Sequence, residues 1–307
     1  MATPDVSIII LNYNSTEFTL SCLRSIIDLT ATVRYEIIVV DNGSSPAEYE
    51  ALLPITAHPF VKLVRNRVNT GFSGGNMTGV QVASPATRYY YFLNNDCLLL
   101  NDVCDQLVHF MDQTPDAGIC TAQMLSASLE PRLSFQYFPT AAVKLLGHGF
   151  MRFCHPGQYP PLRGCYTKPV KVPLVMGSSL FVRPCAFHRI GGFDTTYFLY
   201  CEEEDICKRL LLNGYSAYLV PQASYIHLGG KSTKRTLDVE KEYYISLFHY
   251  FHKYHAWPER MLLRSFYFVK NARKFYRNTN YVKLAFFILT GSPTRSSLRH
   301  KQTQWAN

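Results

Sequence analysis

The sequence lacks several patterns that would by themselves define a class of protein. Its nine cysteines are scattered, odd in number and without a CxxC pair. Neither a disulfide framework nor a structural zinc site is therefore expected, and a reducing cytoplasm fits best. No stretch reaches the roughly 18 apolar residues that a membrane span needs. Residues 1–6 show no charged segment leading into an apolar one, so we expect no signal peptide.

Acidic residues are scarce in the last quarter of the chain. Residues 231–307 contain 15 Lys and Arg against 4 Asp and Glu, whereas residues 1–230 contain 16 against 18. The formal net charge of +9 therefore comes from the C-terminal part. This asymmetry indicates a polyanionic partner, namely a membrane surface, a phosphorylated substrate or nucleic acid. Nucleic acid is the least favoured of these, because the basic and aromatic tail carries no recognised reading motif.

Continuous apolar runs predict the buried strands of an α/β fold. Between the runs, apolar residues recur at helical spacing, as Leu20, Leu23 and Ile27 do. Strands that alternate with helices predict a mainly parallel sheet with right-handed crossovers. The predicted strands cover residues 6–11, 35–40, 61–64 and 89–93, and further strands are predicted near 118–122 and 172–183.

Polar side chains stand directly after two of these strands. Asp41 follows the second run, and Asn94-Asn95-Asp96 follows the aromatic fourth run. The carboxyl ends of parallel strands share one crevice, where open α/β sheets bind ligands, so both carboxylates are expected to face a ligand. Asp96 would hold a divalent cation or accept hydrogen bonds from a hydroxylated ligand. The alternative is a plain turn, for which Asn and Asp are equally suited.

A glycine-rich segment, Asn69 to Asn76, lies between the third and fourth strands. Its glycines, Gly71, Gly74 and Gly75, allow a backbone to approach a ligand closely. The segment is not a P-loop, because the Gly-Lys-Ser/Thr ending is absent, nor is it a GxGxxG fingerprint. We therefore expect a ligand-binding glycine loop, with a tight turn as the alternative.

The densest acidic cluster, Glu202 to Asp205, stands at the start of a predicted helix. The helix macrodipole favours carboxylates at this place and accounts for some of them. Carboxylates crowded behind apolar residues should raise the pKa of at least one member. A raised carboxylate pKa suits a general base that works near neutral pH.

His227 follows a strand-like stretch later in the chain. A lone histidine is more often a structural residue than a ligand. Together with Asp96 it would form a mixed carboxylate and imidazole site that suits Mn²⁺. The sequence alone does not place these two side chains together.

The remaining segments suggest how the chain is organised. Residues 129–171 are rich in Pro, Gly and aromatics without a sustained period, and we expect a long loop that covers the crevice. A helix is predicted over 238–256, and residues 261–289 are basic, aromatic and roughly amphipathic. The expected division is a catalytic domain over 1–235, with a nucleotide-binding half at about 1–122 and an acceptor-side half at about 123–235, and a basic helical extension over 236–307.

The ordered set of these segments resembles the inverting family 2 glycosyltransferases of the GT-A fold. It is most similar to the rhamnosyltransferase-like members that build bacterial surface polysaccharides. The resemblance covers about residues 5–232 of the chain. The matching segments are residues 6–14, 39–45, 69–76, 92–96, 176–179, 191–194, 201–205 and 227–232.

The resemblance implies a nucleotide-sugar site at the strand ends. Asp41 would contact the base or ribose, and the glycine loop would close over the donor. Asn94-Asn95-Asp96 stands where the family has its Asp-x-Asp motif, which leaves Asp96 as the anionic metal ligand, and His227 matches a further metal contact of some members. The implied donor-binding residues are Asn12, Tyr13, Asn14, Asp41, Asn69, Gly71, Gly74, Gly75, Asn76, Asn94 and Asn95, and the implied ligands of Mn²⁺ or Mg²⁺ are Asp96 and His227.

The acidic cluster matches the family's Glu-Asp-x-Asp pattern, whose first Asp is usually the catalytic base. Glu203 stands at that position and is one methylene longer than Asp, with Glu202 and Asp205 as reserves. The resemblance implies that this carboxylate takes a proton from an acceptor hydroxyl. The hydroxyl oxygen then displaces the nucleotide diphosphate and inverts the anomeric carbon.

The implied function is transfer of a sugar, with L-rhamnose from dTDP-rhamnose as a candidate, to a lipid-linked or polysaccharide acceptor. The basic extension would dock on an anionic membrane surface, which places the protein at the inner face of the cell membrane. Its alternative role is a solvated face packed on the catalytic domain. The departures at Asn94 and Glu203 leave a second hypothesis, a catalytically weak sugar- or nucleotide-binding protein on the same fold.

Overall fold

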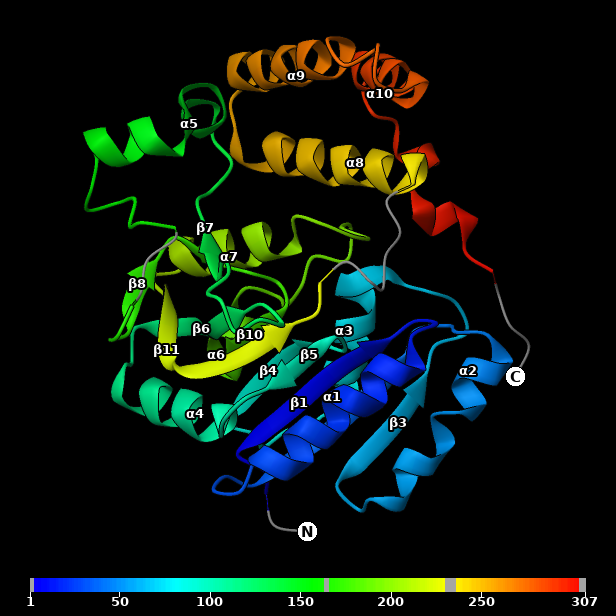
Figure 1. Ribbon diagram of the computed structural model, residues 1–307, viewed down its shortest axis with the longest axis vertical. Helices are drawn as coiled ribbons and strands as arrows, with labels where there is room; N and C mark the ends of the chain where they lie inside the picture. Colours follow the sequence, from blue (N-terminus) through cyan, green and yellow to red (C-terminus); the bar gives the residue numbers. More distant parts are fainter. Residues whose placement is uncertain (1–2, 163–165, 230–235, 304–307) are drawn as a thin grey trace.

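A mixed sheet forms the centre of the molecule (Figure 1). The computed structural model describes residues 3–162, 166–229 and 236–303. Within these residues the sheet has nine strands in the order β3-β2-β1-β4-β10-β6-β11-β5, with β8 also paired to β11. The four strands predicted first are parallel to one another, as expected. They are β1 (Val6–Asn12), β2 (Tyr35–Asp41), β3 (Val61–Arg65) and β4 (Tyr89–Asn94).

The second half of the sheet mixes strand directions. β10 is antiparallel to β4 and β6, while β11 is parallel to β6 and antiparallel to β5 and β8. The end of β11 pairs His227 with Cys97, immediately after the polar end of β4. The strands are β5 (Cys97–Leu99), β6 (Ala117–Leu125), β8 (Val170–Val172), β10 (Ser179–Val182) and β11 (Ser216–His227), and β7 (Phe135–Gln136) pairs separately with β9 (Leu174–Val175).

Helices cover both faces of the sheet. Successive strand residues point to opposite faces, so Ile8 and Ile10 lie on the face covered by α1 and α4, whereas Ile9 lies on the face covered by α3, α6 and α7. Burial on both faces explains why β1 and β4 consist almost entirely of apolar and aromatic residues. The elements are α1 (Thr16–Leu29), α2 (Pro46–Glu50), η1 (Leu53–Ala57), α3 (Gly71–Val82), α4 (Val103–Gln113), α6 (Pro184–Arg189) and α7 (Glu202–Leu212).

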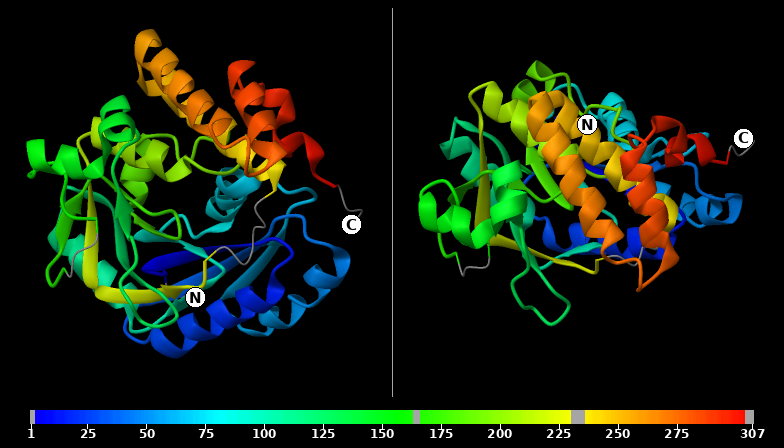
Figure 2. Two further views of the ribbon diagram at one scale, coloured as in Figure 1. Left: turned by 45° about the horizontal axis from the view of Figure 1, so that its top comes forward. Right: turned by 90° about the horizontal axis from the view of Figure 1, so that it is seen from above.

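The C-terminal region is helical, as predicted, and packs over the segment that precedes α7 (Figures 1 and 2). Tyr197 and Cys201 from that segment share an apolar cluster with Tyr250, Phe251 and Leu263. The predicted division of the chain at residue 235 stays a prediction, because residues 230–235 lie outside the described part. The elements are α8 (Leu237–Tyr254), α9 (Trp257–Ala272), α10 (Thr279–Leu289), η2 (Thr294–Ser296) and η3 (Leu298–Lys301).

Residues 129–171 contain more regular structure than the predicted loop. Besides β7 and β8 they include α5 (Ala141–Cys154), whose N-cap Thr140 side chain accepts a hydrogen bond from the Val143 amide at 3.2 Å. Gly147 interrupts this helix with φ of 82°. The break divides the helix into two short pieces, and neither piece is long enough to show a sustained helical period.

The glycine-rich segment is a helix start and not a loop. Residues from Gly71 onward belong to α3, which packs directly on β1. A Cβ added at Gly79 would lie 2.4 Å from Cγ2 of Ile9, and one added at Gly75 would lie 3.0 Å from a Leu11 methyl carbon. These two glycines therefore permit close contact between helix and sheet, which local sequence patterns do not distinguish from a flexible loop.

Replacing Gly79 by Ala tests this packing. Overpacking against Ile9 should lower the free energy of unfolding by about 1–3 kcal/mol, although alanine favours a helix by about 1 kcal/mol relative to glycine. Gly149→Ala in α5 is the control, because a Cβ there meets no atom within 4 Å. Urea unfolding measures both variants, and equal stability of the two would contradict the packing interpretation.

Candidate active site

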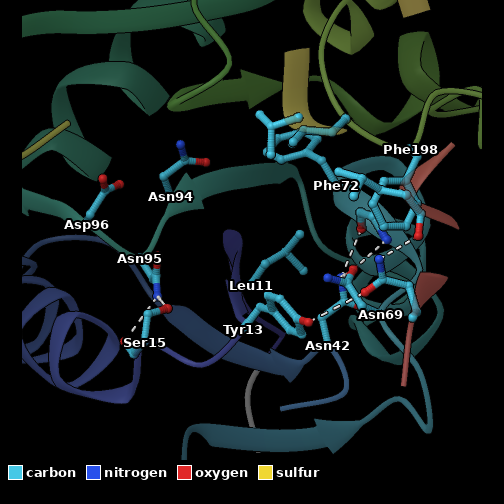
Figure 3. A pocket seen from close by; sticks show the side chains of 15 residues that line it. Leu11, Tyr13, Ser15, Asn42, Asn69, Phe72, Asn94, Asn95, Asp96 and Phe198 are labelled. Carbon is cyan, nitrogen blue, oxygen red and sulfur yellow. Dashed lines mark hydrogen bonds between the residues drawn. The ribbon is translucent and has the colours of Figure 1, made fainter. Parts of the chain in front are cut away.

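An open cavity of about 380 Å³ lies at the carboxyl ends of β1, β2 and β4 (Figure 3). This is the edge where the sequence predicted a ligand site. Its wall combines strand ends, the start of α3, the segment before α7 and the end of the chain. Lining residues from the strand ends and the start of α3 include Leu11, Tyr13, Asn42, Asn69, Asn94 and Asp96.

Asn42 links the end of β2 to the start of α3. Its Oδ1 accepts hydrogen bonds from the Thr70 amide at 3.1 Å and the Thr70 hydroxyl at 2.9 Å. Its Nδ2 donates to the Gly71 carbonyl and to Asn69 Oδ1, each at 3.0 Å. Asn42 was not among the predicted site residues, and its place directly after the strand-end Asp41 was the available signal.

Asp41 lies behind the cavity wall. The side chain is fully buried, and it accepts hydrogen bonds from Asn12 Nδ2 at 3.1 Å and the Ser44 amide at 3.3 Å. Arg65 Nε lies 3.5 Å from the same carboxylate. In this structure the carboxylate orients the turn that follows β2. The direct contact between Asp41 and a base or ribose stays a prediction.

The other predicted donor-binding residues divide into two groups. Asn14, at φ of 48°, accepts a hydrogen bond from the Ser45 amide at 2.9 Å, and Asn76 Nδ2 donates to the Phe72 carbonyl at 3.0 Å. These two side chains lie outside the cavity and hydrogen-bond to the backbone of its surroundings. The predicted donor-binding residues that line the cavity are Tyr13, Asn69, Gly71, Asn94 and Asn95. Those that lie outside its lining are Asn12, Asn14, Asp41, Gly74, Gly75 and Asn76.

Asp96 and His227 meet at one end of the cavity. His227 Nε2 lies 3.1 Å from Asp96 Oδ1, and the Asp96 side chain is almost fully buried. The pairing of β11 with β5 produces this contact, since His227 lies opposite Cys97. Next to it, Asn95 Nδ2 donates to the Ser15 hydroxyl at 2.7 Å, which fixes the strand end against α1.

The donor set of Asp96 and His227 fits a divalent cation. Among the described residues, these two and Cys97 form the group whose ligand atoms all lie within 4.8 Å of one another. A carboxylate oxygen and an imidazole nitrogen suit Mn²⁺. Burial raises the pKa of the Cys97 thiol well above its ordinary value, and its Sγ lies 3.5 Å from the Ser178 carbonyl. The carboxylate and imidazole are therefore the two groups available to a cation.

Glu203 lies close to the same strand end. A Cβ added at Gly177 would be 3.5 Å from Glu203 Cδ, and the next carbonyl, that of Ser178, accepts a hydrogen bond from the Asn94 amide at 3.0 Å. The Glu203 side chain is half-buried. Burial raises its pKa, and backbone hydrogen bonds at Glu203 and Gly177 only partly offset the rise. These are the properties that the sequence predicted for a base.

Glu202 and Glu204 flank Glu203 in the first turn of α7. Burial, followed by the charge of Glu203, raises the pKa of each well above the ordinary value. Each also has one buried carboxylate oxygen without a hydrogen-bond partner within the described part of the chain. One negative charge in this group therefore disfavours a second, as predicted for crowded carboxylates.

Asp205 is the member of the cluster whose carboxylate is engaged by neighbouring side chains, and its role as a reserve base stays a prediction. Its fully buried carboxylate accepts hydrogen bonds from Arg209 Nε, Lys253 Nζ and the Tyr254 hydroxyl, each at 2.7 Å. Two cationic side chains and a phenol occupy the lone pairs of this carboxylate. Asp205 therefore connects α7 to α8.

Some lining residues come from parts of the chain without any site pattern. Phe198 lies beside the start of α3, where its carbonyl accepts a hydrogen bond from the Phe72 amide at 2.8 Å. Leu298 and Gln302 line the cavity from the end of the chain. The sequence carried no local signal for these residues, because tertiary packing alone brings them to the strand ends.

Sequence comparisons agree with these observations. The family model described as Glycosyl transferase family 2 matches residues 7–142. Rhamnosyltransferase WbbL of Escherichia coli (strain K12) is 29% identical over 203 residues, which cover 63% of this chain and 72% of that protein. The N-acetylglucosaminyl-diphospho-decaprenol L-rhamnosyltransferase of Mycobacterium tuberculosis (strain ATCC 25618 / H37Rv) is 44% identical over 59 residues, which cover 19% of each chain.

A solved structure shows the same fold. The mannosyltransferase PcManGT from Pyrobaculum calidifontis, in complex with GDP-Man and Mn²⁺, superposes with a TM-score of 0.56 at 16% identity. The match covers 95% of this chain and 76% of that one. Every helix that the structure describes is too short or too polar to cross a bilayer.

Proposed function

Since the chain is a family 2 glycosyltransferase with the GT-A fold, we propose that it transfers a sugar with inversion from a nucleotide sugar to a lipid-linked or polysaccharide acceptor. The observation that carries this proposal is the placement of Glu203 beside the strand end that holds the pair of Asp96 and His227. A base and a cation site close to the same strand end are what a single displacement requires.

In the proposed mechanism Glu203 takes the proton of an acceptor hydroxyl. The hydroxyl oxygen forms a bond to the anomeric carbon on one face, while the bond from that carbon to the diphosphate oxygen breaks on the opposite face. Mn²⁺ or Mg²⁺ held by Asp96 and His227 would neutralise charge on the diphosphate. The nearby Asn94 and Asn69 side chains line the cavity in which the donor would lie.

L-Rhamnose from dTDP-rhamnose is the donor we propose first. Two of the relatives described above are named as rhamnosyltransferases. The name of the mycobacterial one includes a diphospho-decaprenol. A lipid diphosphate of this kind combines an anionic head with an apolar chain. The basic C-terminal region suits such an acceptor.

A panel assay tests the proposal. The protein is incubated with dTDP-, UDP- and GDP-sugars in Mn²⁺ or Mg²⁺, and release of nucleoside diphosphate is measured with and without lipid extracts as acceptors. We expect release that depends on both one donor and an acceptor. Binding without turnover across the panel would instead support a catalytically weak binding protein on this fold.

We also propose that the surface formed by α5, α9 and the turn after α9 docks on the inner face of the cell membrane. A cavity of about 640 Å³ lies there, with Arg273 and Arg277 among its lining residues. Phe275 and Tyr276, on the turn after α9, are 65% and 69% exposed. Basic side chains beside exposed aromatic rings are complementary to anionic headgroups and the adjoining acyl region.

Charge reversal at Arg273 and Arg277 tests this docking. Each Lys or Arg near an anionic surface contributes about 1 kcal/mol, so the double Glu variant should lower partitioning onto vesicles with phosphatidylglycerol at least about tenfold. Vesicle flotation at low salt measures the change. The double Glu variant of Arg24 and Arg132, both exposed, alters net charge equally and should bind as the parent does. If both double variants lose vesicle partitioning equally, the surface of α5, α9 and the turn after α9 is not the docking surface.

A further inference from the structure

The last described residues of the chain form part of the donor cavity. We propose that Leu298 and Gln302, on a segment of residues 297–302 that we name the C-terminal strap, bind the nucleoside part of the donor. This inference rests on the proposed function and extends it. Both residues line the cavity together with Asn42 and Asn69, and Figure 1 shows the strap in red descending from α10 toward the sheet.

A buried carboxylate holds the strap in place. Glu242 of α8 is 1% exposed, and its two oxygens accept hydrogen bonds from the Ser297 hydroxyl at 3.1 Å and the Leu298 amide at 2.8 Å. The guanidinium of Arg299 donates to the Thr196 carbonyl at 3.3 Å. Each oxygen of this buried carboxyl is therefore paired with a hydrogen-bond donor on the strap. The strap is therefore a fixed wall of the cavity.

The position of the strap along the cavity points to the nucleoside. Asp96 lies at one end, and Asn42 and Asn69 lie toward the other (Figure 3). A donor whose diphosphate lies beside Asp96 would extend its nucleoside toward Asn69. Gln302 contacts Tyr13, which lies next to Asn42 in Figure 3, and Leu298 lines the same cavity.

Contacts of Gln302 place an aromatic ring and an amide on the same wall. Its Oε1 accepts a hydrogen bond from the Tyr13 hydroxyl at 3.5 Å, and its Nε2 donates to the Leu298 carbonyl at 2.6 Å. A carboxamide offers two N–H donors and two lone pairs, so these contacts leave one of each for a ligand. Tyr13 is 42% exposed, and an open tyrosine ring is a suitable surface for a nucleobase to stack on.

Isothermal titration with nucleoside diphosphates tests the strap. The full-length Leu298→Ala/Gln302→Ala variant and the parent are titrated with dTDP, UDP and GDP in Mn²⁺, and with pyrophosphate in Mn²⁺. We expect the Kd of the preferred nucleoside diphosphate to rise about tenfold through lost apolar contact and hydrogen bonding. The Kd of pyrophosphate, which has no nucleoside, should stay within twofold of the parent value, on the order of measurement error.

The control is His300→Ala, on the same segment. His300 lines a separate cavity together with Thr196 and Ile245, so this variant should keep the parent's affinities. If the double variant binds nucleoside diphosphates as the parent does, the strap does not bind the nucleoside. The same holds if its affinity for pyrophosphate falls by an equal factor. Either result overturns the strap inference and leaves the proposed function standing. A parent that binds none of the three nucleoside diphosphates overturns the proposed function, and the strap inference with it.

Discussion

Replacing Glu203 by Gln should lower kcat by roughly 10²–10⁴-fold, because a general base usually contributes that factor. Glutamine keeps the size of the side chain but cannot accept the acceptor's proton. The donor should still bind with near-parent affinity, since the acid cluster lies at α7 and not among the residues that line the nucleotide end of the cavity. Steady-state kinetics with the donor identified by the panel, together with titration of dTDP, UDP and GDP, measure both quantities.

Two variants of neighbouring acids serve as controls. Asp205→Asn weakens the ion pairs with Arg209 and Lys253, so its main effect should be a lower melting temperature and not a defect specific to chemistry. Glu202→Gln replaces a buried carboxyl whose pKa is raised by burial and by Glu203, so its kcat should stay close to that of the parent. If Glu202→Gln loses more activity than Glu203→Gln, the base has been assigned to the wrong residue.

The pH dependence of the reaction should follow the protonation of Glu203. Burial raises the pKa of Glu203 above the ordinary glutamate value, and a base acts only when it is deprotonated. The rate should therefore be at its plateau above this raised pKa and fall as the pH drops through it. The fall should begin at a higher pH than an exposed glutamate would give. Rates measured from pH 4.5 to 8 on folded protein should show one such limb, and the limb should be absent from the residual activity of Glu203→Gln.

The parallel half of the sheet was predictable from sequence because it is buried on both faces. Burial on both faces makes β1, apart from Ser7, and β4 apolar up to the last residue, and each strand ends where Asn12 or Asn94 begins the polar edge. By contrast, α3 was hidden by Gly75 and Gly79, whose small size serves contact with β1. In local sequence, a glycine needed for packing looks the same as a glycine needed for a loop.

The candidate site was predictable only where the functional residue stood in a recognisable local sequence pattern. Asp96, His227 and Glu203 each stood in a local pattern, although the contact between Asp96 and His227 depends on the pairing of β11 with β5. Gln302 stood in no pattern, because its contact with Tyr13 joins residues 289 positions apart. Contacts of this kind depend on how α8 and the chain end pack, and no periodicity of the sequence reports such packing.

Replacing Asp96 by Asn should lower kcat/KM by roughly 10²–10³-fold, because a bound cation contributes several kcal/mol to stabilising the leaving diphosphate. Asparagine has nearly the same shape, so the variant should fold, but it removes the negative charge that faces His227. Mn²⁺ binding followed by electron paramagnetic resonance should weaken in parallel, which separates loss of the cation from a general defect. Unchanged Mn²⁺ affinity in Asp96→Asn would contradict the assignment of this carboxylate as the ligand.

Asn94→Asp should raise the affinity for Mn²⁺, whereas Asp96→Asn should lower it. Asn94 lines the cavity at the end of β4, two residues before Asp96, so the new carboxylate would stand beside the proposed cation site. A second anionic oxygen near the cation should tighten Mn²⁺ binding by about tenfold, the equivalent of 1.4 kcal/mol. Weaker binding would mean that repulsion between the two carboxylates exceeds their attraction for the ion, and would contradict a place for residue 94 among the ligands of the cation.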